Sequence, residues 1–422
     1  MLNDVGPCAG PKAPTPSPAE PPPHPSLQSR RGLDWFAFFI ADVQTGFGPF
    51  IAVYLTTEAW TQVDIGLVLT IGGLVALVAQ VPGGALVDAV RSERLLAAIA
   101  VTMIAATALA IAVWPIFVIV LAAKTLHSVA SCVLGPAMAA ISLGLVGHAG
   151  IGERLGRNAR FASIGNGLAA AALGACGHYV SNRAVFFLTA ALIIPSLLAL
   201  YRIRAEEIDP ERAHGGNLVH DPKPRAAGLG SLLRNRPLLV LSACAALFHL
   251  ANAAMLPLMA GIVTMRSSDW APVLVAACIV VPQLVVVAFA PWVGRQAQVW
   301  GRLPLLLVGF GALPVRGVLF AFVSDPYVLV AVQLLDGITA AVLGVMVPLI
   351  IADVTRGTGR FNLAQGIVGS VVGVGASIST FLAGYMNDHF GSMAAFLGLA
   401  GLAAAGFALV LLAMPETRPE KG

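Results

Sequence analysis

The sequence predicts an all-α integral membrane protein, because of its composition and the long apolar runs that recur along it. Of its 422 residues, 58% are hydrophobic and only 11% are charged, and the mean hydropathy is +0.85. About a quarter of the residues of a soluble domain are charged, so this composition is typical of a chain that lies in lipid. Backbone polar groups find no water in hydrocarbon, so apolar runs of this kind must be helices rather than open strands.

Twelve apolar runs of about 20 residues, each bounded by a charge, proline, glycine or asparagine, are predicted to be transmembrane helices. Their predicted limits are 33–57, 63–87, 94–113, 116–146, 161–180, 185–201, 238–265, 271–293, 303–323, 327–351, 361–383 and 392–413. The longest polar interruption, 202–237, separates them six and six. We therefore expect an N-terminal six-helix bundle at 33–201, a linker loop at 202–237 and a C-terminal six-helix bundle at 238–413.

The basic residues predict the orientation in the membrane. With the N-terminus inside, 21 of the 25 Lys and Arg residues fall in the tails or in loops on the same side. This asymmetry satisfies the positive-inside rule and predicts that both termini and the linker loop are cytoplasmic. The first segment, 1–32, is rich in proline and lacks the apolar core of a signal peptide, so we expect a disordered tail, with a second short tail at 414–422.

The remaining composition argues against several classes of function. The net charge of +4 follows from the loop asymmetry and is weak evidence for nucleic-acid binding. The five cysteines are scattered without CxxC spacing, so we expect no disulfide framework, metal site or cofactor. No Gly-x-x-x-x-Gly-Lys-(Ser/Thr) segment occurs, which argues against ATP as an energy source. The cysteines are Cys8, Cys132, Cys176, Cys244 and Cys278.

The two halves of the chain repeat one another. AAKTLHSVASCVLG, around Lys124, aligns with AVQLLDGITAAVLG, around Gln333, at a shift of 209 residues. QTGFGP in the first run aligns with NAAMLP in the seventh at a shift of 208, and Trp60 aligns with Trp270 at a shift of 210. Three matches at nearly one spacing indicate duplicated six-helix halves related by an axis along the membrane normal.

Lys124 and His127 stand in the middle of an apolar run. If this run enters the bilayer near Ile116, the two residues lie about 12 and 16 Å deep, near the centre of a hydrocarbon core about 30 Å thick. Their spacing of three places them on one helix face. Because a charge at this depth is costly, we expect both side chains to face protein or a water-filled cavity.

The same estimate of depth finds polar pairs in three further runs and no ionisable group near the bilayer centre in runs 2, 3, 5, 6, 11 and 12. The polar residues near the centre therefore come from runs 1, 4, 7 and 10 only. We predict that they line one shared substrate and proton cavity. The eight candidates are Asp42, Gln44, Lys124, His127, His249, Asn252, Gln333 and Asp336.

Arg316, in the ninth run, lies at a depth similar to that of Asp336 in the tenth. Because a buried pair of opposite charges is tolerated where a lone charge is not, an ion pair between them is expected. Direct contact of these charges with substrate is the alternative. The ordinary pKa of histidine lies near neutral pH, so His127 and His249 are candidates to carry a coupling proton, with a hydrogen-bonded structural role as the alternative.

Over residues 33–414 the sequence resembles the Major Facilitator Superfamily, which carries a Gly-x-x-x-Asp-(Arg/Lys)-x-Gly-(Arg/Lys) loop between helices 2 and 3. GALVDAVRSERL supplies Gly84 and Asp88 but lacks the following Gly, and its Arg91 and Arg94 are displaced. The copy in the second half, GRQAQVWGRLP, has Gln298 at the acidic position. The resemblance implies that these loops latch the two halves on the cytoplasmic side; a loop that only fixes topology is the alternative for the arginines. The second copy retains Gly294, Gly301 and Arg302.

The resemblance also bears on the fourth and fifth helices. The family's helix 4 often carries Arg-x-x-Gln-Gly, whose arginine is associated with proton coupling; Lys124, His127 and Ser128 occupy these positions. Helix 5 of the family's antiporters carries a glycine-rich segment ending in Gly-Pro, of which Gly165 and Gly174 remain. Close packing of helices explains these glycines equally well. In the family's fold, helices 1, 4, 7 and 10 line the central cavity.

We expect a monomeric secondary active transporter in the bacterial inner membrane, moving a small organic solute by alternating access, with a proton as coupling ion. Efflux by antiport is the leading direction, and proton-coupled uptake of a metabolite is the second. A non-transporting receptor or scaffold is a third reading, against which the polar pairs in four helices argue. An intramembrane protease using Ser377 in GVGASIST is disfavoured, so we do not expect an enzyme.

Overall fold

A computed structural model describes residues 25–45, 49–216, 229–266 and 271–419, and every regular element in these ranges is a helix. Within these ranges the side chains of residues 42–45, 49, 229, 261–266, 271–273, 275 and 326 are left undescribed. The predicted disordered tail at 1–32 falls mostly outside the described residues. The all-α prediction is confirmed, since long apolar helices make up the described chain.

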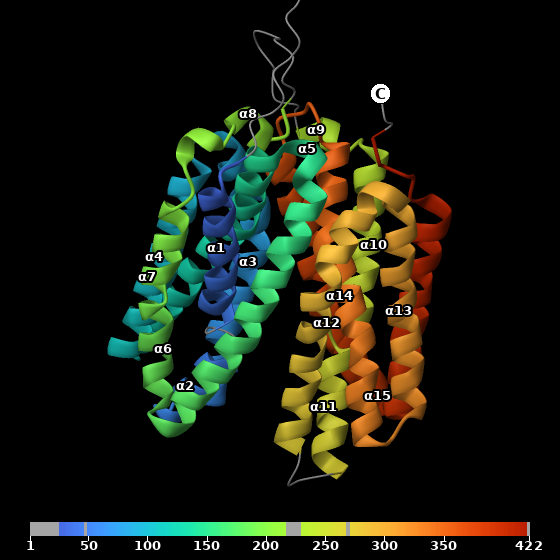
Figure 1. The fold of residues 1–422 in the computed structure, drawn as a ribbon. Coiled ribbons are helices and arrows are strands. Elements are labelled where there is room, and N and C mark those ends of the chain that lie inside the picture. Colours follow the sequence, from blue (N-terminus) through green and yellow to red (C-terminus); the bar gives the residue numbers. More distant parts are fainter. Residues whose placement is uncertain (1–24, 46–48, 217–228, 267–270, 420–422) are drawn as a thin grey trace, which may run out of the picture.

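The helices form two groups that lie side by side (Figure 1). The first group consists of α1 (Leu27–Thr45), α2 (Pro49–Thr57), α3 (Gln62–Ala89), α4 (Glu93–Val113), α5 (Phe117–Tyr179), α6 (Asn182–Ala191) and α7 (Ile193–Tyr201). The short elements η1 (Ala205–Glu207), α8 (Pro210–Ala213) and α9 (Leu229–Leu232) follow. The second group consists of α10 (Arg236–Asn252), α11 (Met255–Arg266), α12 (Ala271–Trp300), α13 (Leu303–Phe322), α14 (Pro326–Val354) and α15 (Phe361–Ala413).

Nine helical segments of the described chain are long and apolar enough to cross a membrane. Two of them, α5 with 63 residues and α15 with 53, are too long for one crossing, since 63 residues of helix span about 95 Å. Each contains one glycine with non-helical angles, Gly147 at φ 65° and Gly391 at φ 82°. Glycine has no Cβ and accepts positive φ, so the chain turns back there. The count of twelve stays a prediction, because residues 46–48 between α1 and α2 are not described.

Polar residues at the ends of the apolar runs determine where several helices begin. Ser92 and Ser181 precede α4 and α6, and each side-chain oxygen accepts a hydrogen bond from a backbone N–H of the first turn. Asn235 and Asp325 do the same for α10 and α14. These caps satisfy N–H groups that a helix cannot pair by itself, which matters most next to a medium without water.

Each group has its own apolar core. One core joins buried residues from Leu33 to Ala213, and the other joins residues from Leu232 to Met414. The second core also takes in Ala139, Leu143 and Ile151 of α5. The part of α5 near its kink therefore packs against the second group.

The two groups meet closely at the end of the bundle where α1 begins and α15 ends, and Figure 1 shows them spread apart toward the other end. We call the first the basic end, because Arg30, Arg94, Arg154 and Arg302 lie there. A Cβ on Gly84 would collide with the backbone of Asn362, and a Cβ on Gly294 would collide with the backbone of Gly152. Only glycine permits these helices to approach so closely.

These contacts follow the sequence repeat. Gly84 and Gly294 are 210 residues apart, and so are the residues that they contact, Gly152 and Asn362. A second pair of contacts has the same spacing. A Cβ on Gly156 would meet Ala290, and one on Gly366 would meet Gln80. The structure thus gives the repeat a physical role at the interface between the groups.

Gly84→Val should force the two groups apart at the basic end, because the new side chain has no space against Asn362. Gly73→Val, on the same helix but with nothing within 4 Å of its Cβ position, is the matched control. The measurement is the distance between spin labels at the exposed positions 91 and 356 in a cysteine-free background. The distribution should lengthen in Gly84→Val alone; equal distributions in both variants would contradict the role assigned to this glycine.

Candidate functional site

A cavity of about 430 Å³ lies in the second group between α10, α14 and α15. Most of its lining is apolar, and the polar side chains His249, Asn252, Asp336 and Thr339 stand out against it. Cavities that are largely apolar with a few polar groups are typical of sites for small organic molecules. Three of the predicted cavity residues are therefore brought together here.

Arg316 closes one side of this cavity through Asn252 and Asp336. Its Nη1 lies 2.5 Å from Asn252 Oδ1 and 2.6 Å from Asp336 Oδ1. The side chain of Arg316 is 1% exposed and that of Asp336 is 22% exposed, and the guanidinium lies 5.2 Å from the ring centroid of Phe320. The arginine is thus buried behind the wall, while the carboxylate faces the cavity. The geometry is that of the ion pair considered from the sequence.

Gln333 does not line this cavity, although its sequence position suggested that it would. It is fully buried, and its Nε2 donates to the backbone oxygen of Cys278 on α12 at 3.2 Å. Gln333 and Asp336 are three positions apart and share one side of α14, but they are offset by about 60° around the helix axis, and this offset lets Gln333 face α12 while Asp336 faces the cavity. Gln333 joins α14 to α12.

Lys124 and His127 lie in the first group and form no part of the cavity lining. The aliphatic chain of Lys124 packs over Gly72 of α3, where a Cβ would collide with it. His127 is 6% exposed, and its Nε2 lies 3.3 Å from Ser131 Oγ. The side chains of Asp42 and Gln44, the remaining candidates, lie outside the described residues. Convergence of all four helices on one chamber therefore stays a prediction.

Asp88 connects the two groups at the basic end. Its Oδ1 accepts hydrogen bonds from Asn362 N at 3.1 Å and Asn362 Nδ2 at 2.9 Å, and its Oδ2 accepts one from Leu363 N at 2.8 Å. The first N–H groups of α15 have no partner within their own helix, and a negative charge is favoured at that position. A carboxylate of the first group therefore caps a helix of the second.

The arginines next to Asp88 do not share this contact. Arg94 donates to the backbone oxygen of Ile203 and lies over the Tyr201 ring at 5.7 Å, both within the first group, and Arg91 is exposed. In the second copy, Gly301 adopts φ 93° and Arg302 Nε lies 2.8 Å from Asp353 Oδ2. The resemblance implied a latch made by Asp88 with its arginines, but among the contacts of the described residues the Asp88 carboxylate alone of these side chains reaches the second group.

The segment 205–216 of the predicted linker is folded against both groups. Asp209 N donates to Gly144 O at 3.3 Å in the first group. Phe361 N of the second group donates to His214 O at 3.2 Å, and Gly357 N donates to Gly215 O at 2.6 Å. This part of the linker thus bridges the halves beside the Asp88 cap.

His214 also contacts the first group through its side chain. Its Nε2 lies 3.0 Å from Glu93 Oε1. Burial acts to lower the pKa of His214, but the contact with Glu93 and the nearby charge of Asp88 outweigh burial and raise it above its ordinary value. The imidazolium form is therefore favoured between two carboxylates where the halves meet.

A network of charges joins α1 to α5 at the basic end, and the sequence patterns did not single it out. Asp34 Oδ1 accepts from Arg154 Nη2 at 2.6 Å and from Arg157 Nε at 2.8 Å, and Asp34 Oδ2 accepts from Arg157 Nη2 at 2.6 Å. Arg154 Nε also donates to Asn158 Oδ1 at 2.8 Å. Asp34 lies at the start of the first apolar run, and this carboxylate is the signal in the sequence that could have indicated the network. The two arginines contribute to the predicted orientation in the membrane, and no pattern links them to Asp34.

Comparisons with known proteins agree with this architecture. The sequence profile described as Major Facilitator Superfamily matches residues 35–313 and 241–422. Proteins of two strains of Mycobacterium tuberculosis, each described as an uncharacterized MFS-type transporter, are 40% identical over 389 residues, covering 92% of this chain and 93% of theirs. The tetracycline resistance protein, class B, of Escherichia coli is 32% identical over 105 residues, which is 25% of this chain and 26% of that protein.

A solved structure has the same fold. The crystal structure of the human organic anion transporter MFSD10 (TETRAN) matches with a TM-score of 0.65, covering 91% of this chain and all of that chain. The sequence identity is 16%. At that identity the likeness supports the fold and nothing about the substrate.

His214 should make the basic end sensitive to pH. Because its pKa is raised in the folded protein, the stabilisation is fully present below the unfolded pKa of about 6.5 and is lost as pH rises through the higher folded pKa. The thermal unfolding midpoint should therefore fall as pH increases from about 6.5 to about 8. This fall should be reduced in His214→Gln and retained in His178→Gln, whose histidine is exposed. An equal fall in the two variants would contradict the assignment.

Arg316→Ala should destabilise the protein by about 3 kcal/mol, because it leaves the Asp336 carboxylate without its buried partner. Adding Asp336→Asn removes the uncompensated charge, so the double variant should regain part of the loss. The free energy of unfolding of both variants, measured by urea titration in detergent, checks this. A double variant no more stable than Arg316→Ala would show that the pair is not the source of the effect.

Proposed function

The chain belongs to the Major Facilitator Superfamily, and we propose that it is a secondary active transporter that moves a small organic solute by alternating access. Members of this family are integral membrane transporters and not enzymes. The proposed location is the bacterial inner membrane, with the basic end and both termini in the cytoplasm, as the distribution of Lys and Arg predicts.

The observation that carries the proposal is the cavity beside Asp336. It combines apolar walls with a carboxylate, an amide and an imidazole, deep within helices that are long and apolar enough to cross a membrane. Ionisable groups at such depth are costly and are retained mainly in substrate or ion pathways. A scaffold has no comparable need for His249 and Asp336 at this place.

Alternating access requires two units that separate at one end and then at the other. The proposed units are the six-helix bundles 33–201 and 238–413. The Asp88 cap and the glycine contacts support this view, because they hold the basic end closed by short-range interactions that can be broken and remade. Separation of the units there would expose the cavity to the cytoplasm.

Proton coupling is proposed for the ionisable residues near the bilayer centre. Asp336 shares Arg316 with Asn252, so protonation of the carboxylate would weaken its hold on the arginine and change the cavity wall. Lys124 has no carboxylate within 4.0 Å among the side chains that the structure describes. Asp42, on α1, is the proposed counter-charge. A buried lysine changes its protonation more readily than an arginine, which suits a group that must release a proton.

Efflux by antiport is the proposed direction, and uptake by proton symport is the alternative. The partial similarity to a tetracycline resistance protein favours efflux of an organic compound. Mixed charges at the candidate residues leave the charge of the substrate open, and no cofactor is proposed. The proposed unit is a monomer, because each chain contributes both halves.

Lys124→Ala and Asp42→Asn should each abolish coupled transport while leaving expression near normal. The assay is flux of a compound panel into proteoliposomes, with and without an imposed pH gradient. Asp64→Asn, which removes a partly exposed carboxylate outside the cavity, is the control and should transport normally. Full gradient-driven flux in either central variant would remove that residue from the coupling path. Flux of no compound by the unmodified protein would favour the scaffold alternative.

A further inference from the structure

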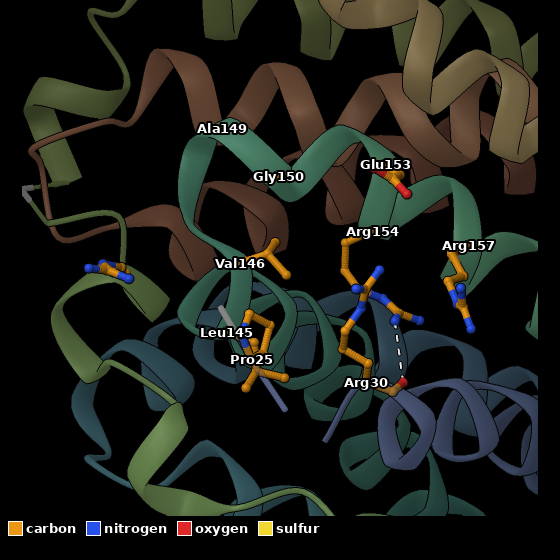
Figure 2. A pocket seen from close by; sticks show the side chains of 10 residues that line it. Pro25, Arg30, Leu145, Val146, Ala149, Gly150, Glu153, Arg154 and Arg157 are labelled. Atoms are coloured by element: carbon orange, nitrogen blue, oxygen red, sulfur yellow. Dashed lines mark hydrogen bonds between the residues drawn. The ribbon is translucent and has the colours of Figure 1, made fainter. Parts of the chain in front are cut away.

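A second cavity, of about 430 Å³, lies at the basic end away from the central site. It is an open cavity bounded by the start of α1, the kinked region of α5 and α8, and four arginines line it: Arg30, Arg154, Arg157 and Arg212. Figure 2 shows Arg30, Arg154 and Arg157 gathered around it. Guanidinium groups that share one small cavity repel one another unless negative charge balances them.

The carboxylates near this cavity do not fully balance these positive charges. Asp34 serves both Arg154 and Arg157, and Asp209 lies 3.2 Å from Arg212 Nε. Glu153 lies on the cavity lining. Four guanidinium groups thus face three carboxylates, and one positive charge is left over. Arg30 has no acidic partner within 4.0 Å in the part of the chain that the structure describes.

Aromatic side chains place this cavity at the level of lipid headgroups. Trp35 is 45% exposed and its ring centroid lies 6.1 Å from that of Phe161. The guanidinium of Arg157 lies 5.8 Å from the Phe161 ring. Exposed tryptophan beside phenylalanine and arginine is typical of the boundary between hydrocarbon and headgroups. Part of the cavity lining, Leu145 and Val146, is also apolar.

We propose that this cavity binds the phosphodiester group of an anionic phospholipid, with Arg30 and Arg212 as ligands beside the pair of arginines held by Asp34. A phosphodiester carries one negative charge, which equals the excess. Its unesterified oxygens accept hydrogen bonds from guanidinium groups, which are the preferred partners of phosphate. Basic pockets between helices on the cytoplasmic side are known to receive such headgroups. Because Arg212 belongs to α8, a bound lipid would hold the linker segment against α5.

The test is lipid binding by the purified full-length protein in detergent. Retained phosphatidylglycerol is counted by native mass spectrometry, and its affinity is measured by titration. Arg30→Gln and Arg212→Gln should each weaken phosphatidylglycerol binding about fivefold, and the double variant further. Neither change removes a side chain of the Asp34 network, and the backbone oxygen of Arg30 that accepts from Arg154 remains. Unchanged thermal unfolding without lipid confirms folding. Arg31→Gln, an exposed neighbour outside this cavity, should bind as the unmodified protein does.

Any of the following results would overturn the proposal. The first is wild-type affinity in the double variant, or an equal loss in Arg31→Gln. The second is equally tight binding of phosphatidylcholine, whose headgroup has no net charge. The third is displacement of phosphatidylglycerol by an equal concentration of inorganic phosphate, which would make the cavity a site for free phosphate. Transport activity is not a readout, so failure here leaves the proposed function standing.

Discussion

The capping of α15 by Asp88 is the interaction on which the closed basic end depends. Its two oxygens accept three N–H groups of Asn362 and Leu363 across the interface. The contact is possible only because Gly84, one turn earlier on α3, lets the helices touch. Charge and close packing therefore act together: the glycine permits the approach, and the carboxylate makes it favourable. The linker contacts of His214 and Gly215 reinforce the same closure.

Closure at one end only would leave the buried polar groups accessible from the other end. The cavity beside Asp336 would be useless to a solute if it stayed shut at both ends. The halves repeat one another at their interface, where Gly84 and Gly294 meet residues that are also 210 positions apart. The acid of the first copy is, however, replaced by Gln298 in the second. The contact at Gly84 and the contact at Gly294 are thus alike in packing and unlike in charge. The first contact is held by packing and by the carboxylate of Asp88, and the second is held by packing.

The sequence predicted the features that follow from composition and from the spacing of apolar residues. It missed those that depend on the direction in which a side chain points. Apolar runs predicted that the chain is helical and located most helix limits, but the predicted start of the fifth run, residue 161, lies inside α5, whose helical break is at Gly147. Asp88 was singled out by the family resemblance and not by the runs or the repeat. Depth alone suggested Gln333 as a cavity residue, but its side chain faces α12. Depth says nothing about rotation of a helix around its axis. The Asp34 network was missed because its residues are 120 or more positions apart and look like ordinary ends of spans.

Access to the cavity is the most direct test of the account. Ala340 lines the cavity and is exposed, so a cysteine placed there in a cysteine-free background reports which side reaches it. An impermeant thiol reagent should modify Ala340→Cys from the side opposite the basic end, and from the basic end once Asp88→Ala is added. Modification from the basic end in both proteins would contradict the account, and so would no modification from either side in both.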